Sequence, residues 1–292
     1  MDQSFFLKRY KSIGGDIQDI QLRKTLRVNT LKISTSEVKR RLEEKGVSLE
    51  EIPFVKNAFY YESRFSLGAT PEYLLGYYYL QEAASMIPAV VLNPSPGEVV
   101  LDMCAAPGSK STQLCELMNN TGVLIAVEKN RKRAEALSNN LERTGCRNAA
   151  VLLKDALEIE AGERFDRILL DAPCSGNYLS EPNWFVKRNI AGILKNSEMQ
   201  KRLIEKAFKL LKRGGTIVYS TCSLEPEEDE EIVDYAIRVL GMQAEQTGLE
   251  IGVQAVLEFN GREYEKSVSL ARRLWPHLTG TQGFFIAKLK KG

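Results

Sequence analysis

The sequence contains only one histidine, His277, among 292 residues. This scarcity excludes a cluster of histidine ligands for a metal and leaves a Ser–His–Asp triad a single candidate imidazole. The five cysteines are odd in number and form no close pair, which argues against a disulfide framework and against a zinc ribbon. We therefore expect reduced thiols and no bound metal.

Long apolar stretches are lacking as well. No run reaches the roughly 18 residues that a membrane span requires. The amino end has no long apolar core and carries charges at Asp2, Lys8 and Arg9, so we do not interpret it as a secretory signal. We expect a cytoplasmic protein that has no membrane partner.

The composition that remains is that of an ordinary soluble globular protein, with 43% hydrophobic and 27% charged residues. A chain of 292 residues can form one large α/β domain with a smaller second one. The formal net charge of +2 does not by itself indicate nucleic acid, because binding to phosphate depends on where the cations gather.

Residues 1–75 are typical of a small α+β domain. The pattern predicts an amphipathic helix over residues 5–10, a strand over residues 25–31 and a capped helix that follows Ser36 and stops at Gly46. This segment is rich in basic residues: Lys8, Arg9, Lys11, Arg23, Lys24, Arg27 and Lys32. They form either an ordinary solvated surface or a patch that faces RNA. A tyrosine-rich stretch at residues 73–79 fits either base stacking or packing between domains.

From Glu98 onward, β-rich runs alternate with helical runs, which is typical of an α/β fold with a mostly parallel sheet between two layers of helices. The predicted strands cover residues 99–103, 122–127, 149–153, 165–171, 216–220 and 284–289. The predicted helices lie near residues 111–118, 131–143, 197–211 and 228–240.

A ligand-binding turn follows the first of these strands. Residues 102–110 read DMCAAPGSK, and the small residues before the helix let a ligand approach the backbone and the free N–H groups of the helix. The turn is neither G-x-G-x-x-G nor a Walker motif. Acids at the ends of later strands, Glu128, Asp155 and Asp171, suit an adenosine that has no pyrophosphate. S-adenosylmethionine fits this pattern better than NAD, and Arg133 is either part of the same pocket or a surface cation.

Two cysteines, Cys174 and Cys222, follow neighbouring predicted strands. Carbon 5 of cytosine accepts a methyl group once a thiolate has added to carbon 6, so a pair of thiols suits that reaction. A free thiol is mostly protonated at neutral pH, and Lys110 is placed to favour the thiolate. Asp171 is placed to hydrogen-bond the edge of the base.

These residues resemble the NOP/Sun family of RNA cytosine-5 methyltransferases. The matching segments are DMCAAPGSK at 102–110, Glu128, Asp155, DAPCSG at 171–176, YSTCS at 219–223, RVNTLK at 27–32, GYYYLQEAASMIP at 76–88 and RLWPHLTGTQGFFIA at 273–287. The resemblance implies a Rossmann-like methyltransferase sheet over residues 76–292 behind a small α+β RNA-recognition domain over residues 1–75. It also implies S-adenosylmethionine as the methyl donor and an RNA cytosine as the substrate.

The resemblance further implies a role for each candidate residue. In that family the attacking thiol is the one in T-C-S, which makes Cys222 the nucleophile and Cys174 the thiol that assists release. The catalytic set is Cys222, Cys174, Asp171 and Lys110. The cofactor-binding set is Cys104, Ala105, Ala106, Pro107, Gly108, Ser109, Lys110, Glu128, Arg133, Asp155 and Asp171.

The stretch after Gly176 lacks the Arg-rich segment of some bacterial family members, and the chain is similar in compactness to the short archaeal members that modify tRNA. We therefore expect a monomer that acts on tRNA. An rRNA substrate, methylation of a protein or small molecule, and a noncatalytic RNA-binding assembly factor are the alternatives.

Two further segments carry structural expectations. The acidic run EPEEDEE at residues 225–231 is interpreted as the solvated amino end of a helix, where the helix dipole favours negative charge. Residues 275–277, Trp-Pro-His, either shape the base pocket or pack the last hairpin, and we favour packing.

Overall fold

The N-terminal part of the computed structural model, which describes residues 3–18 and 20–292, forms a small antiparallel sheet. Its strands follow the order β2-β3-β1-β4, and they are β1 (Thr25–Val28), β2 (Ser48–Glu51), β3 (Ala58–Glu62) and β4 (Tyr78–Leu80). Helices α2 (Thr35–Glu43) and α3 (Pro71–Leu74) accompany it. Helix α2 is capped by Ser34, two residues before the predicted cap, because the Ser34 side chain accepts the Glu37 N–H.

A second, larger sheet makes up the rest of the molecule and confirms the α/β class. Its order is β11-β14-β15-β9-β8-β5-β6-β7, with β10 paired to β15. The parallel strands are β5 (Val99–Asp102), β6 (Val123–Glu128), β7 (Ala149–Leu153), β8 (Phe165–Asp171) and β9 (Leu211–Thr221). The antiparallel strands are β10 (Gln243–Glu245), β11 (Val253–Gln254), β14 (Arg272–Leu274) and β15 (Phe284–Lys290). The sheet is therefore mixed, because every strand after β9 runs against its neighbour.

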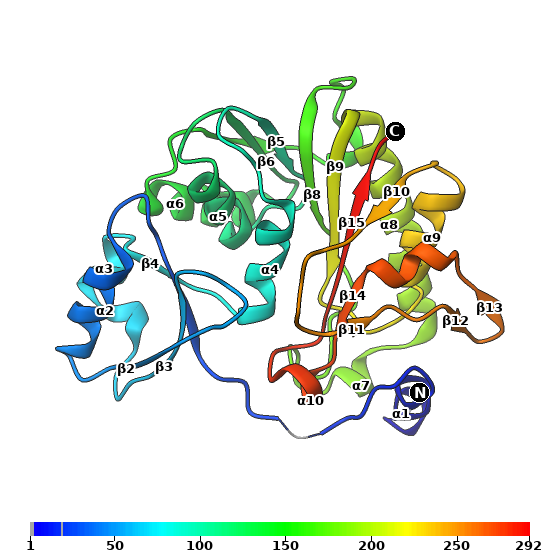
Figure 1. The fold of residues 1–292 in the computed structure, drawn as a ribbon, viewed down its shortest axis with the longest axis horizontal. Coiled ribbons are helices and arrows are strands. Elements are labelled where there is room, and N and C mark those ends of the chain that lie inside the picture. Colours follow the sequence, from blue (N-terminus) through cyan, green and yellow to red (C-terminus); the bar gives the residue numbers. More distant parts are fainter. Residues whose placement is uncertain (1–2, 19) are drawn as a thin grey trace.

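Helices cover both faces of the large sheet (Figure 1). One apolar core joins the sheet to α4 (Ala83–Leu92), α5 (Ser109–Leu117) and α6 (Arg131–Thr144). The other joins it to α8 (Ile190–Leu210) and α9 (Glu230–Arg238). Short elements complete the chain: α7 (Trp184–Lys187), α10 (Pro276–Thr279) and the hairpin β12 (Glu258–Phe259) with β13 (Arg262–Glu263).

The order of the strands reverses at β5. The chain passes outward from β5 to β6 and β7, then crosses back to place β8 on the other side of β5. In open α/β sheets, ligands bind beyond the carboxyl ends of the strands at such a reversal. The residues after β5, β6, β8 and β9 are therefore brought to one edge of the sheet.

The N-terminal sheet packs against α5 and α6 through buried polar contacts. Arg27 is 2% exposed and forms an ion pair with Glu116 of α5, and the Asn29 amide donates to the carbonyl of Thr144 at 2.7 Å. Tyr79 is buried, and the Arg143 guanidinium lies 5.5 Å from its ring centroid. Arg27 and Tyr79 thus join the N-terminal sheet to α5 and α6, which leaves neither of them on an open RNA-facing surface.

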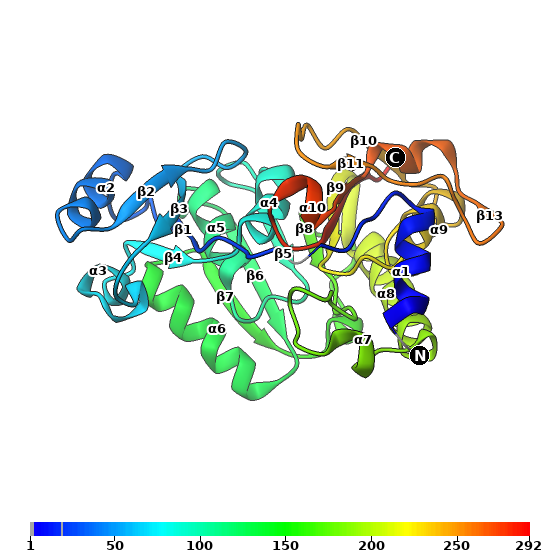
Figure 2. The same ribbon diagram turned by 90° about the horizontal axis from the view of Figure 1, so that it is seen from below.

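Helix α1 (Gln3–Ser12) lies beside α7, away from the N-terminal sheet that follows it in sequence (Figure 2). Phe6 packs edge to face on Trp184 at 4.8 Å between ring centroids, and Tyr10 packs on Trp275 at 5.7 Å. The packing role expected for Trp275 agrees with this contact, since its side chain is buried. Arg9 of this helix is 8% exposed and bonds Glu225 and Glu227, each at 2.6 Å.

The acidic run at 225–231 is buried, so its interpretation as a solvated helix terminus is wrong. Glu225, Glu228, Asp229 and Glu230 are all 0% exposed. The reason is that cations from distant segments reach them, Arg9 from α1 and Arg273 from β14, the latter 2.5 Å from Glu230. Buried charges persist when they are paired and hydrogen-bonded in this way.

Replacing Arg9 with methionine is expected to lower the free energy of unfolding by about 3–5 kcal/mol, because Glu225 would stay buried without its cation. Denaturant unfolding followed by circular dichroism measures this loss. Lys8→Met is the matched control, since Lys8 lies on the same helix and is exposed. Equal stabilities for the two variants would contradict the assigned role of the Arg9 pair.

Candidate active site

The loop between β5 and α5 forms the floor of the site. Gly108 caps α5 with φ of 105°, a conformation that residues with a side chain rarely adopt. A Cβ there would also lie 2.9 Å from Leu137 Cδ1. The chain therefore turns sharply into α5, and the free N–H groups of the first turn of α5 lie beside the loop.

One cavity, of about 300 Å³, lies between this loop and the ends of β6 and β7, and we call it the β6–β7 cavity. Among its lining residues are six members of the predicted cofactor set: Cys104, Ala106, Glu128, Arg133, Asp155 and Asp171. Cys174, Cys222 and apolar side chains such as Val127 and Leu157 also line it. The combination of carboxylates and an apolar wall suits a ligand with hydroxyl groups and a flat ring.

The acids of this cavity are held by local bonds. Glu128 is 5% exposed and accepts the N–H of Asn130 at 2.8 Å. Arg133 lies 3.2 Å from Glu128 and donates to the carbonyl of Ala106 at 2.8 Å, although its side chain is 58% exposed. Asp155 accepts the N–H of Leu157 at 3.0 Å and so caps a 3-10 turn. Glu128 and Asp155 both line the cavity, and each has a cation beside its carboxylate, Arg133 and Lys129 respectively.

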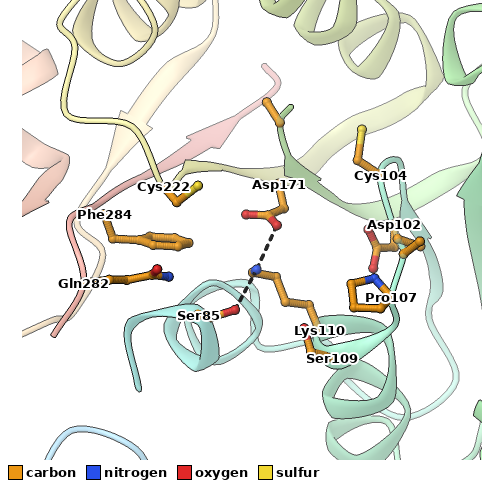
Figure 3. A pocket seen from close by; sticks show the side chains of 13 residues that line it. Ser85, Asp102, Cys104, Pro107, Ser109, Lys110, Asp171, Cys222, Gln282 and Phe284 are labelled. Atoms are coloured by element: carbon orange, nitrogen blue, oxygen red, sulfur yellow. Dashed lines mark hydrogen bonds and ion pairs between the residues drawn. The ribbon is translucent and has the colours of Figure 1, made fainter. Parts of the chain in front are cut away.

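A second cavity, of about 220 Å³, lies next to the first, and we call it the β15 cavity (Figure 3). The Lys110 ammonium donates to Asp171 at 2.8 Å and to the Ser85 hydroxyl at 2.9 Å. The other Asp171 oxygen accepts from Ser220 at 2.9 Å. Phe284 stands beside Cys222 and provides a flat apolar wall. Further predicted residues line this cavity as well: Ala105, Pro107 and Ser109.

The two thiols meet at the wall between the cavities. The Sγ atoms of Cys174 and Cys222 are 3.3 Å apart. Cys222 lines both cavities, whereas Cys174 lines the β6–β7 cavity. The sequence places both cysteines just after neighbouring strands, and the pairing of Asp171 with Ser220 in the β8–β9 ladder brings the two loops together.

The environments of the two thiols differ. A hydrogen bond from the Cys174 thiol, together with the positive charge of Lys110, holds the pKa of Cys222 below its ordinary value. The bond to Cys222, burial and the negative charge of Glu228 raise the pKa of Cys174. Of the two coupled thiols, Cys222 is the one whose pKa is lowered.

Besides Asp102 and Ala172, which adjoin predicted residues, sequence reasoning left three side chains that line the β15 cavity unassigned: Ser85, Gln282 and Phe284. They carry no strong chemical signal, and α4 and β15, which supply Ser85 and Phe284, are far apart in sequence. Glu82 links the two segments, because its carboxylate accepts the N–H of Ser85 at 3.2 Å and the N–H of Gln282 at 3.0 Å. Both segments belong to the stretches that resemble the NOP/Sun family, and that resemblance is the sequence feature that could have pointed to these three side chains.

Within residues 3–18 and 20–292, no group of three metal-ligating side chains is arranged to hold an ion. Over the same described residues, no helix has both the length and the apolar character that crossing a membrane demands. Cys115 of α5 is buried, and Cys146, which follows α6, is half-buried against the same apolar core.

Known proteins share both the sequence and the fold. The family model for the 16S rRNA methyltransferase RsmB/F matches residues 89–290, and the model for the N-terminal domain of RsmF matches residues 8–83. A tRNA (cytosine(49)-C(5))-methyltransferase of Pyrococcus abyssi is 43% identical over 92% of this chain and 88% of its own length. The 25S rRNA (cytosine-C(5))-methyltransferase nop2 of Schizosaccharomyces pombe is 41% identical over 91% of this chain, which spans 46% of that longer protein.

Solved structures agree with these matches. A methyltransferase homolog from Pyrococcus horikoshii is 39% identical, with a TM-score of 0.90 over 99% of this chain and 95% of its own. NSun6 from Pyrococcus horikoshii, solved with SFG, an analogue of S-adenosylmethionine, is 27% identical, with a TM-score of 0.82 over 93% of this chain and 91% of its own. These matches confirm the resemblance seen in the motifs. The chain belongs to the RsmB/F family, also known as Sun/NOP, of RNA cytosine-C5 methyltransferases.

Proposed function

We propose that this enzyme methylates carbon 5 of a tRNA cytosine by way of a covalent bond between Cys222 and carbon 6 of the base. The observation that carries the proposal is the pair of thiols, 3.3 Å apart, at the wall shared by the two cavities. A methyl donor in one cavity and a base in the other would meet at Cys222. The base has to leave its stack to reach this wall.

The β6–β7 cavity fits S-adenosylmethionine. Glu128 would accept the ribose hydroxyls, Asp155 would face the adenine amino group, and the backbone from Cys104 to Gly108 would lie along the ligand. Arg133 would steady the loop through its bond to the Ala106 carbonyl. When bound, the cofactor supplies an electrophilic methyl group on a positively charged sulfur.

The chain's own residues then handle the base. The Cys222 thiolate adds to carbon 6, and the electron pair of the carbon 5–carbon 6 double bond becomes available at carbon 5. Asp171 and Lys110, joined at 2.8 Å, hydrogen-bond the polar edge of the ring and stabilise the charge that develops there. After carbon 5 is methylated, Cys174 removes the proton from carbon 5, the double bond re-forms and the sulfur of Cys222 departs.

Replacing Glu128 with glutamine is expected to raise the dissociation constant for S-adenosylmethionine roughly tenfold to a hundredfold, because hydrogen bonds to a charged acceptor are lost. Isothermal titration calorimetry measures this constant. Glu135→Gln is the matched control, since Glu135 is exposed on α6 and lines neither cavity. An affinity within twofold of the wild type would remove Glu128 from the cofactor site.

The choice of tRNA rests on the relative from Pyrococcus abyssi, whose name gives tRNA as its substrate and which this chain matches over most of its length. The chain spans less than half of the rRNA-modifying nop2 protein. We assign RNA binding to residues 1–75, the small domain proposed from the sequence, although β4 at Tyr78–Leu80 also pairs with that sheet. A monomer in the cytoplasm is the setting that we propose for this activity.

Transfer of tritiated methyl groups from S-adenosylmethionine to unmodified tRNA tests the proposal. We expect label in tRNA that ribonuclease releases, with a single cytosine-5 product after nucleoside digestion. Label in ribosomal RNA alone would favour the rRNA alternative. No label in either RNA, with S-adenosylmethionine bound, would favour a noncatalytic assembly factor.

A further inference from the structure

The residues that follow the two thiols share one buried carboxylate. Ser175 comes directly after Cys174 and Ser223 directly after Cys222, and their hydroxyl oxygens lie 3.5 Å apart. The Ser175 N–H donates to the two oxygens of Glu228 at 3.0 and 3.2 Å, and its hydroxyl donates at 2.5 Å. Burial raises the pKa of the same carboxylate, and an interaction with the Ser223 side chain opposes that rise. Glu228 therefore contacts both loops that carry a thiol.

Glu228 is itself firmly placed. It is 0% exposed, its N–H donates to the carbonyl of Glu225 at 2.9 Å, and its carbonyl accepts from the Tyr219 hydroxyl at 2.5 Å. It lines neither the β6–β7 cavity nor the β15 cavity. Glu228 thus has no direct access to a substrate and can act only through the groups that it holds.

The thiol loops need such a tie because the sheet does not connect them. The ladder between β8 and β9 ends at the pair Asp171 and Ser220, before either cysteine. Beyond it, the Ala172 N–H still bonds Ser220, and the Asn177 amide donates to the Cys222 carbonyl at 2.8 Å. Further bonds hold the residues next to the thiols: the Ser175 carbonyl accepts from Trp184 and Arg188 at 2.7 and 2.8 Å, and the Ser223 hydroxyl accepts the Glu225 N–H at 3.1 Å. Glu228 differs from these groups because it interacts with the residue after each of the two thiols.

We propose that Glu228 is a positioning residue that fixes the separation and orientation of Cys174 and Cys222 by holding the serines that follow them. This inference rests on the proposed two-thiol mechanism. A role in activating the thiols is opposed by its charge, since the Glu228 carboxylate raises the pKa of Cys174 and tends to raise that of Cys222. We therefore assign Glu228 a role in positioning the thiol loops and not in activating the thiols.

The first test measures the geometry of the thiols without any RNA. Glutathione disulfide joins Cys174 to Cys222: one thiolate displaces glutathione to form a mixed disulfide, and the second thiolate displaces the other glutathione. Two electrons pass from the cysteine pair to glutathione disulfide. The equilibrium constant reports how well the thiols are aligned, and peptide mass spectrometry identifies the Cys174–Cys222 link among the other cysteines.

Glu228→Gln is expected to lower this equilibrium constant about tenfold, because its amide NH2 faces the Ser175 donors and leaves one of them unpaired. Glu227→Gln is the matched control. It removes the same charge one residue away, where the partner is Arg9 rather than a serine. Ser175→Ala keeps the N–H and loses the hydroxyl, so it is expected to lower the equilibrium constant by a smaller factor. If Glu228→Gln does not fold, Ser175→Ala alone tests the positioning role of Glu228.

The second test separates positioning from electrostatics by the pH dependence of single-turnover methyl transfer. Loss of a nearby negative charge lowers the pKa of the thiols, so a purely electrostatic role predicts a midpoint at lower pH with an unchanged plateau. Positioning predicts a plateau that falls roughly tenfold to a hundredfold, because misaligned reacting groups lose rate steeply. The KM for RNA should stay within twofold of the wild type.

The proposal is overturned if Glu228→Gln and Ser175→Ala leave both the disulfide equilibrium and the plateau unchanged, or if Glu227→Gln changes them equally. A wild-type enzyme that methylates no RNA would instead overturn the proposed function. The disulfide equilibrium would still report the role of Glu228 in that case, so the two failures are distinct.

Discussion

Cys222→Ala is expected to lower the rate of methyl transfer at least about a thousandfold, because it removes the sulfur that forms the bond to carbon 6 in the proposed mechanism. The loss should appear in kcat, with the affinity for S-adenosylmethionine nearly unchanged. Single-turnover transfer to tRNA, with cofactor binding measured in parallel, gives both quantities.

Cys146→Ala is the matched control for this result. Cys146 is a half-buried cysteine that follows α6 and lines neither cavity. We expect it to keep the wild-type rate within about threefold, as is usual for small changes away from a site. A Cys222→Ala enzyme that retains a tenth or more of the activity would show that Cys222 is not the nucleophile.

Cys174→Ala is expected to accumulate a protein–RNA adduct that survives denaturation. Addition of Cys222 and methylation proceed, but no thiol removes the proton from carbon 5, so the sulfur–carbon bond persists. Repeated turnover should fall roughly a hundredfold to ten-thousandfold, which is the range for a lost general base. A denaturing gel with labelled tRNA shows the adduct as a shifted band, and one methyl group per enzyme should be transferred.

The same gel separates the two possible assignments of the thiols. Cys222→Ala and the double variant should give no band, since neither contains the attacking sulfur. A shifted band with Cys222→Ala and none with Cys174→Ala would reverse the assignment, as would be expected if the thiol in the Pro-Cys pair attacked. Because the two sulfur atoms are adjacent, the distance between them does not identify the nucleophile, and the shifted band does.

The parts of the fold that were predictable are those that short stretches of sequence specify. The strand at Ala149–Leu153 and the strand at Phe165–Asp171 occur at the predicted residues, because an apolar run bounded by polar residues is a local signal. Asp171 ends β8 and Lys110 follows the neighbouring parallel strand β5, and this arrangement lets the two side chains meet at 2.8 Å. Their roles in the reaction stay predictions.

The acidic run shows where local reasoning stops. A row of acids before a helix is normally solvated, and nothing within residues 225–231 indicates burial. The partners come from Arg9, more than 200 residues earlier in the chain, and from Arg273, more than 40 residues later. Pairing across such distances is decided by tertiary packing, and it brings Glu228 close to the thiols.

In the proposed reaction Cys222, and not Cys174, forms the bond to the base. The most direct measurement uses tRNA that carries 5-fluorocytosine, which has no proton at carbon 5 to be removed and so keeps the wild-type enzyme bound to its product. Digestion and mass spectrometry then locate the cysteine that carries the nucleotide. We predict the nucleotide on the peptide containing Cys222, and a nucleotide on the peptide containing Cys174 would show that Cys174 is the nucleophile instead.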